Sequence, residues 1–146
     1  MEKMNFSIEI NAPASRVWEV LWADDTYRQW TAPFNPGSYA ESDWKEGSKI
    51  LFLSPGGDGM VARIAAKQPN KLMSFEHYGM VHNGVEDTTS DAVKGWAGAH
   101  EDYHLSEKDG KTTVRVETDI TDEYKEMFEG IWPKALQRLR EIAEGS

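Results

Sequence analysis

Residues 121–144 at the C-terminal end carry the pattern that most constrains what this chain can fold into. Steps of three and one residue keep the apolar side chains on one face of a 3.6-residue helix, and charged side chains fill the other face. A helix with one apolar stripe needs a complementary surface, so the rest of the chain is expected to form a sheet that receives it. The stripe consists of Tyr124, Met127, Phe128, Ile131, Trp132, Ala135, Leu136, Leu139, Ile142 and Ala143.

Two residues interrupt this predicted helix near its middle, Gly130 and Pro133. Glycine weakens a helix, and proline removes an N–H and brings its ring against the carbonyl four residues earlier, at Glu129. We therefore predict a kink at this point.

The preceding chain alternates as β-strands do. Residues 4–11 place Phe6, Ile8 and Ile10 on one face, and two short helical patterns follow up to Trp30. Short joints rich in turn residues separate the later strands, which indicates antiparallel neighbours. The predicted order is one strand, two short helices, six strands and the long helix, an α+β chain forming a single domain over residues 1–146. The six later strands are predicted at 38–44, 48–53, 59–67, 71–81, 98–107 and 111–120.

Residues 82–97 form the one long connection without a clear period, and long connections in compact domains are often functional. Trp96 stands near its end, between Gly95 and Gly98. Two interpretations of Trp96 stay open: a plug that anchors the loop to the core, or a lid residue over a pocket.

Charge and cysteine content exclude several function classes. The net charge of −9 disfavours nucleic acid and anionic membranes as partners, because both carry negative charge. The chain has no cysteine, so disulfides and thiolate metal sites are excluded. No apolar run is long enough to span a bilayer, and no signal-peptide core begins the chain, so a cytoplasmic location is expected.

The four histidines do not suggest a metal site. His100 and His104 are four residues apart on a predicted strand, which places them roughly 13 Å apart at ~3.3 Å per residue. No metal or other cofactor is therefore expected, and we predict that His82, His100 and His104 lie on solvent-facing surfaces.

His77 differs from the other three. It lies in the apolar phase of its strand with Met73 and Phe75, and Glu101 lies in the apolar phase of the next long strand with Tyr103. If the two strands pair, His77 and Glu101 both face inward. A buried carboxylate needs a partner, so the pair is either a structural hydrogen-bond network or a site for a polar ligand group or acid–base chemistry.

Several motifs resemble those of the START-like (SRPBCC) superfamily, and within it the branch homologous to the activator of Hsp90 ATPase. The resemblance covers the whole chain; Ser48 stands where that superfamily often has a second glycine. The motifs are the run Ile8-Glu9-Ile10-Asn11-Ala12-Pro13-Ala14-Ser15-Arg16-Val17-Trp18, Trp30, the turn Trp44-Lys45-Glu46-Gly47-Ser48-Lys49, the pattern Glu101-x-Tyr103-x-Leu105, the turn Lys108-Asp109-Gly110-Lys111-Thr112, and Trp132-Pro133-Lys134-Ala135-Leu136.

This resemblance implies the helix-grip fold: a curved seven-stranded antiparallel sheet around the C-terminal helix, two short helices after the first strand, and a cavity between sheet and helix. Helix residues 127–132 would line the cavity and residues 136–143 would seal the core, with the Gly130–Pro133 defect as a possible hinge for ligand access. The candidate ligand-binding residues are Trp30, Phe52, Phe75, His77, Trp96, Glu101, Tyr103, Phe128 and Trp132.

Fold does not fix function in this superfamily. The leading hypothesis is binding of a small hydrophobic or aromatic ligand in the cavity. The branch resembled suggests an alternative, a co-chaperone or protein-interaction domain with an Hsp90-type partner. A second alternative is a cyclase- or aromatase-like enzyme in which His77 or Glu101 performs acid–base catalysis and Tyr103 orients the substrate.

Overall fold

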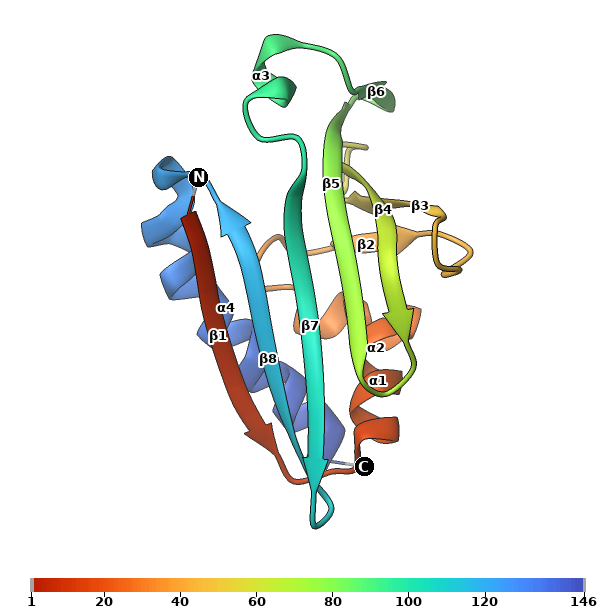
Figure 1. Cartoon of the computed structure of the whole chain (residues 1–146), viewed down its shortest axis with the longest axis vertical. Helices are drawn as coiled ribbons and strands as arrows, with labels where there is room; N and C mark the ends of the chain where they lie inside the picture. Colours follow the sequence, from red (N-terminus) through yellow and green to blue (C-terminus); the bar gives the residue numbers. More distant parts are fainter. Residues whose placement is uncertain (1, 146) are drawn as a thin grey trace.

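The protein forms one curved antiparallel sheet with a long helix along one face, in a computed structural model that describes residues 2–145 (Figure 1). The sheet follows the order β1-β8-β7-β5-β4-β3-β2, and β6 pairs with the end of β5. The elements are β1 (Glu2–Ile10), α1 (Ala14–Trp22), α2 (Asp24–Trp30), β2 (Tyr39–Glu41), β3 (Lys49–Leu53), β4 (Gly59–Gln68), β5 (Leu72–His82), β6 (Val85–Asp87), α3 (Asp91–Lys94), β7 (Ala99–Lys108), β8 (Lys111–Ile120) and α4 (Asp122–Glu144).

The predicted fold class is confirmed, including the two short helices after the first strand and the helix at the end. The first strand pairs with the last and forms one edge of the sheet: Phe6 lies opposite Val116 and Ile8 opposite Val114. Helix α4 packs on β1 and contacts α1 and α2. Figure 1 shows α4 running behind β1 and β8, with α1 and α2 at the lower end of the sheet and α3 at the upper end.

The core lies between the inner face of the sheet and the second half of α4. Leu136, Leu139 and Ala143 from α4 are buried there, and Val17 and Leu21 of α1 join them. The strands alternate inward apolar and outward polar residues, which is why one face of the sheet can receive the helix.

The segment 82–97 is not structureless, contrary to the prediction. A turn at Asn83 and Gly84, both with positive φ (50° and 79°), folds β6 back onto the last residues of β5. Gly79 permits this pairing, because a Cβ there would lie 2.8 Å from the carbonyl oxygen of Asp87. Helix α3 follows, and its Val93 is fully buried. Elements of three and four residues are too short to produce a readable period.

The strand predicted at residues 38–44 is also shorter than expected, since β2 covers only Tyr39–Glu41. Trp44 has a φ of 62°, in the left-handed region, which ends extended structure before it. Within residues 2–145 no helix has both the length and the apolar character needed to cross a bilayer.

Helix α4 passes Gly130 and Pro133 as one uninterrupted helix from Asp122 to Glu144. Pro133 lies on its exposed side, so the missing N–H and the adjacent carbonyl of Glu129 face solvent rather than the core. Water can therefore satisfy that carbonyl, which explains how the helix tolerates the proline.

Replacing Pro133 with Ala is expected to stabilise the protein by about 2 kcal/mol. An internal proline destabilises a helix by about 3 kcal/mol, and its removal gains that amount. Alanine also leaves the unfolded chain more conformational freedom than proline does, which offsets about 0.4–1 kcal/mol of the gain. Urea denaturation should show a higher midpoint with an unchanged slope. Lys134→Ala, at the exposed neighbouring position, should change stability by less than about 0.5 kcal/mol. A lower midpoint for Pro133→Ala would mean that α4 is adapted to the proline.

Candidate functional site

A cavity of about 880 Å³ opens between the inner face of the sheet and the first half of α4. Residues of α2, the 31–39 connection, the β3–β4 turn and the α3 region complete its wall. From α4 the side chains of Met127, Phe128, Ile131 and Trp132 reach it, whereas the later residues of the stripe are in the core. The predicted division of the C-terminal helix into a cavity-lining half and a core-sealing half therefore agrees with the structure.

All the predicted ligand-binding residues except Phe75 line this cavity. Trp30 and Tyr103 are almost fully buried and form its floor, where their rings meet edge to face at 6.3 Å. The ring of Phe75 is completely buried below the wall, in edge-to-face contact with Trp22 at 5.4 Å and Phe52 at 5.0 Å. Phe75 is thus a core residue that supports Phe52, and its assignment to the site is corrected.

Trp96 lines the cavity and is partly exposed. The anchoring role considered for it belongs to Val93, which is fully buried on α3. Ser90 begins α3 by accepting a hydrogen bond from the backbone N–H of Val93. The geometry therefore favours a wall or lid position for Trp96 over a plug.

His77, Glu101 and Tyr103 form a polar cluster on the cavity wall. Strands β5 and β7 pair so that Phe75 lies opposite Glu101 and His77 opposite Ala99, which makes His77 and Glu101 diagonal neighbours on one face. His77 Nε2 lies 3.0 Å from Glu101 Oε1, and the Tyr103 hydroxyl donates a hydrogen bond to Glu101 Oε2. The predicted inward orientation and proximity of these residues are confirmed.

Burial raises the pKa of two tyrosines of this wall, Tyr103 and Tyr27. It raises the pKa of Tyr103 well above its ordinary value, and the negative charge and hydrogen bond of Glu101 raise it further. Burial also raises the pKa of Tyr27, again with a contribution from Glu101. Both phenols therefore stay protonated across the physiological range, and that of Tyr103 donates its hydrogen bond to Glu101.

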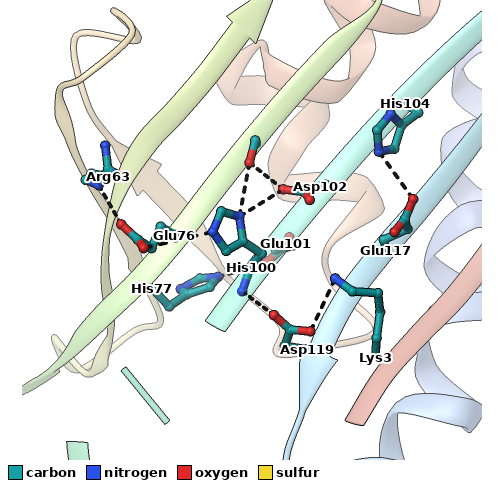
Figure 2. Close-up of polar contacts among 11 residues, drawn as sticks. Lys3, Arg63, Glu76, His77, His100, Glu101, Asp102, His104, Glu117 and Asp119 are labelled. Carbon is teal, nitrogen blue, oxygen red and sulfur yellow. Dashed lines mark hydrogen bonds and ion pairs between the residues drawn. The ribbon is translucent and has the colours of Figure 1, made fainter. Parts of the chain in front are cut away.

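A second polar cluster lies on the opposite, outer face of the sheet (Figure 2). His100 Nδ1 lies 3.4 Å from Asp102 Oδ1 and 3.3 Å from Ser74 Oγ. Glu76 Oε2 lies 3.9 Å from His100 Nε2, and the other oxygen of Glu76 pairs with Arg63 at 2.6 Å. These residues satisfy one another on a solvent-facing surface. Among residues 2–145 no group of three His, Cys, Asp or Glu side chains is placed to hold a metal ion.

The remaining histidines also lie on the outside of the protein. His104 pairs with Glu117 at 3.5 Å on the outer face (Figure 2), and His82 pairs with Asp58 at 3.4 Å at the end of β5. The side chains of His82, His100 and His104 are 75, 36 and 38% exposed, so their predicted surface positions are confirmed.

Several lining residues lie outside the predicted set. Tyr27 and Phe34 come from α2 and the connection after it, and their rings contact Trp30 and Trp132 at 5.6 and 4.8 Å. Phe34 falls between two prolines in a stretch without periodicity, so no local pattern indicates that it turns inward. Met127 and Ile131 also line the cavity, and their place in the apolar stripe of α4, within residues 127–132, does predict this position.

Solved structures with this architecture span most of the chain. The solution structure of the Aha1 dimer from Colwellia psychrerythraea is 22% identical with a TM-score of 0.72, covering 99% of this chain and 97% of that one. DynU16, of the dynemicin biosynthetic locus, is 15% identical with a TM-score of 0.73, covering 100% of this chain and 49% of that one. CalU16 from Micromonospora echinospora is 19% identical with a TM-score of 0.65, covering 98% and 74%.

These identities establish the shared fold and not a shared activity. A search of curated proteins gives no significant match. The family model described as activator of Hsp90 ATPase homolog 1-like protein matches residues 11–144, from the end of β1 to the end of α4. The chain therefore belongs to the activator of Hsp90 ATPase homolog 1-like family, within the START-like superfamily.

Proposed function

We propose that this protein binds a small hydrophobic molecule with aromatic character in the cavity between the sheet and α4. The observation that carries the proposal is the cavity itself, about 880 Å³ in a place where a two-layer fold would otherwise close its core. That volume lies within the usual range for ligand pockets, on the order of 300–1,000 Å³. Aromatic side chains supply much of the wall, including Phe52, Trp96 and Phe128.

The polar cluster supports a site that binds its ligand in one orientation, rather than a purely apolar site without specificity. A ligand pocket is mostly apolar with a few polar groups that fix orientation. His77, Glu101 and Tyr103 are such groups, since they gather on one part of the wall and are held by their own hydrogen bonds. Their rigidity reduces the entropy lost on binding.

Titration with the neutral fluorophore Nile red tests the proposal. A saturable blue shift of its emission with one molecule per chain is expected, together with quenching of tryptophan fluorescence, because Trp30, Trp96 and Trp132 line the cavity. The urea-unfolded protein is the control and should give no saturable signal. The proposal would be contradicted if the folded protein did not shift the emission of Nile red and if neutral aromatic compounds also failed to bind it.

Family membership over residues 11–144 favours a second candidate, stimulation of an Hsp90-type chaperone. The likeness to the Aha1 structure from Colwellia psychrerythraea is consistent with this candidate and does not establish it. The test is the ATPase rate of the Hsp90 from the same cells with increasing amounts of this protein. An unchanged rate at saturating protein would remove the candidate and leave the ligand-binding proposal intact.

A further inference from the structure

The charges on the cavity wall are all of one sign. Among the described residues that line the cavity there are four carboxylates and no lysine or arginine. The cavity is also surrounded by aromatic faces, which carry negative charge density. The carboxylates are Asp58, Glu101, Asp119 and Glu123.

Only one of these carboxylates lies deep in the wall. Asp119 pairs with Lys3 at 3.3 Å on the outer face (Figure 2), and Asp58 accepts a hydrogen bond from the backbone N–H of Asn83 at the end of β5. Glu123 is exposed in the first turn of α4. Glu101 differs from Asp58 and Glu123 because its side chain is only 20% exposed, and from the similarly covered Asp119 because it lies on the inner face of the sheet, against His77 and Tyr103.

Both oxygens of Glu101 have partners on the cavity wall. Tyr103 donates a neutral hydrogen bond to Oε2. His77 lies against Oε1 through Nε2, while its Nδ1 is buried without a hydrogen-bond partner. Neither contact comes from a lysine or arginine, so no permanently cationic side chain among the described residues of the wall is paired with this carboxylate.

The phenols next to Glu101 respond to this charge. After burial itself, the carboxylate of Glu101 is the next cause of the raised pKa of Tyr27 and of Tyr103. A cation on the same wall would offset the charge and lower both pKa values. None of the described lining residues is a lysine or arginine that could supply it.

We propose that the ligand is an organic cation, an amine or quaternary ammonium group on a hydrophobic or aromatic body, with the cationic group at Glu101. The inference rests on the proposed ligand-binding function and adds the charge of the ligand to it. Opposite charges attract more strongly in a low-dielectric cavity than in water, and aromatic faces attract cations further. The same carboxylates and aromatic faces repel anions, so fatty acids and other carboxylate ligands are disfavoured.

Three probes with one hydrophobic body test the charge preference in the unmodified protein: naphthylmethylammonium, naphthylmethanol and naphthoate. Isothermal titration at neutral pH and low ionic strength should give a Kd for the cation about tenfold below that of the alcohol, and the weakest binding for naphthoate. Equal affinities, or tighter binding of naphthoate, would overturn the charge inference and leave the ligand-binding proposal standing. Binding of none of the three would contradict both.

The variant Glu101→Gln tests whether the cation preference depends on the carboxylate of Glu101 or on the rest of the cavity wall. This variant should reduce the preference for naphthylmethylammonium over naphthylmethanol, the ratio of their two Kd values, from about tenfold to about one, whatever it does to the affinity for both probes together. Glu76→Gln removes the same charge from the outer face, where Glu76 pairs with Arg63, and should preserve the cation preference. A cation preference that survives Glu101→Gln would overturn the assignment to Glu101.

Discussion

Replacing Ala99 with Phe is expected to abolish ligand binding, with a Kd raised at least about a hundredfold, while the protein stays folded. Ala99 lies on β7 opposite His77 and lines the cavity beside the polar cluster. A benzyl group there would occupy the space that the ligand needs next to Glu101. Because the new ring fills existing space and buries apolar area, the free energy of unfolding should stay unchanged or rise.

A matched control comes from the same strand. Ser106 is an exposed β7 residue whose side chain points to the outer face, so Ser106→Phe adds the same ring outside the cavity. Its Kd for Nile red should stay within about twofold of the unmodified protein. Wild-type affinity in Ala99→Phe, with a normal thermal transition, would place the binding site elsewhere on the protein.

The inward position of His77 and Glu101 could be predicted because strand periodicity fixes the face on which a side chain lies. In β7 the residues at 99, 101, 103 and 105 share a face, and in β5 those at 73, 75 and 77 do. The predicted phase does not continue to Gly79 and Val81, because a register shift at Tyr78 turns Met80 toward the cavity instead. The 3.0 Å contact between His77 and Glu101 could not be predicted in the same way. It depends on a register between strands separated by the 82–97 segment, which no local pattern specifies.

The sequence also does not indicate which aromatic side chains line the cavity and which are buried in the core. Phe52 and Phe75 both lie on the inner face, and their rings touch at 5.0 Å. Trp22 at the end of α1 covers Phe75, whereas among residues 2–145 the ring contacts of Phe52 are with Phe75 and His77 of β5 and not with a helix. The outcome depends on where α1 ends over the sheet, a tertiary fact that periodicity within either element does not encode.

The length of residues 82–97 and their lack of a period mark the region around Trp96 as unusual, but they do not indicate its short strand and helix. Ser90, the residue before α3, and the Asn83-Gly84 turn are local signals that could have indicated a short helix and a hairpin. Val93, the residue that anchors the segment, stands alone among the surrounding polar residues and so gives no repeating apolar pattern.

Leu139→Ala is expected to lower the free energy of unfolding by about 3 kcal/mol. Leu139 is completely buried in the core-sealing half of α4, and removal of a buried leucine side chain costs about 2–5 kcal/mol through lost transfer energy and the void left behind. Urea denaturation followed by far-ultraviolet circular dichroism measures the change. The exposed Lys134→Ala variant on the same helix sets the baseline, within about 0.5 kcal/mol of the unmodified protein.

Met127→Ala, three helical turns earlier, is the comparison that tests the division of α4. Met127 lines the cavity and is 48% exposed, so its removal enlarges a space that is already open and creates no new void in packed surroundings. Its cost should therefore stay below about 1 kcal/mol, against about 3 kcal/mol for Leu139→Ala. If both variants lost about 3 kcal/mol, the first half of α4 would be as tightly packed in solution as the second half. The cavity, and with it the ligand-binding proposal, would then be contradicted by stability data alone.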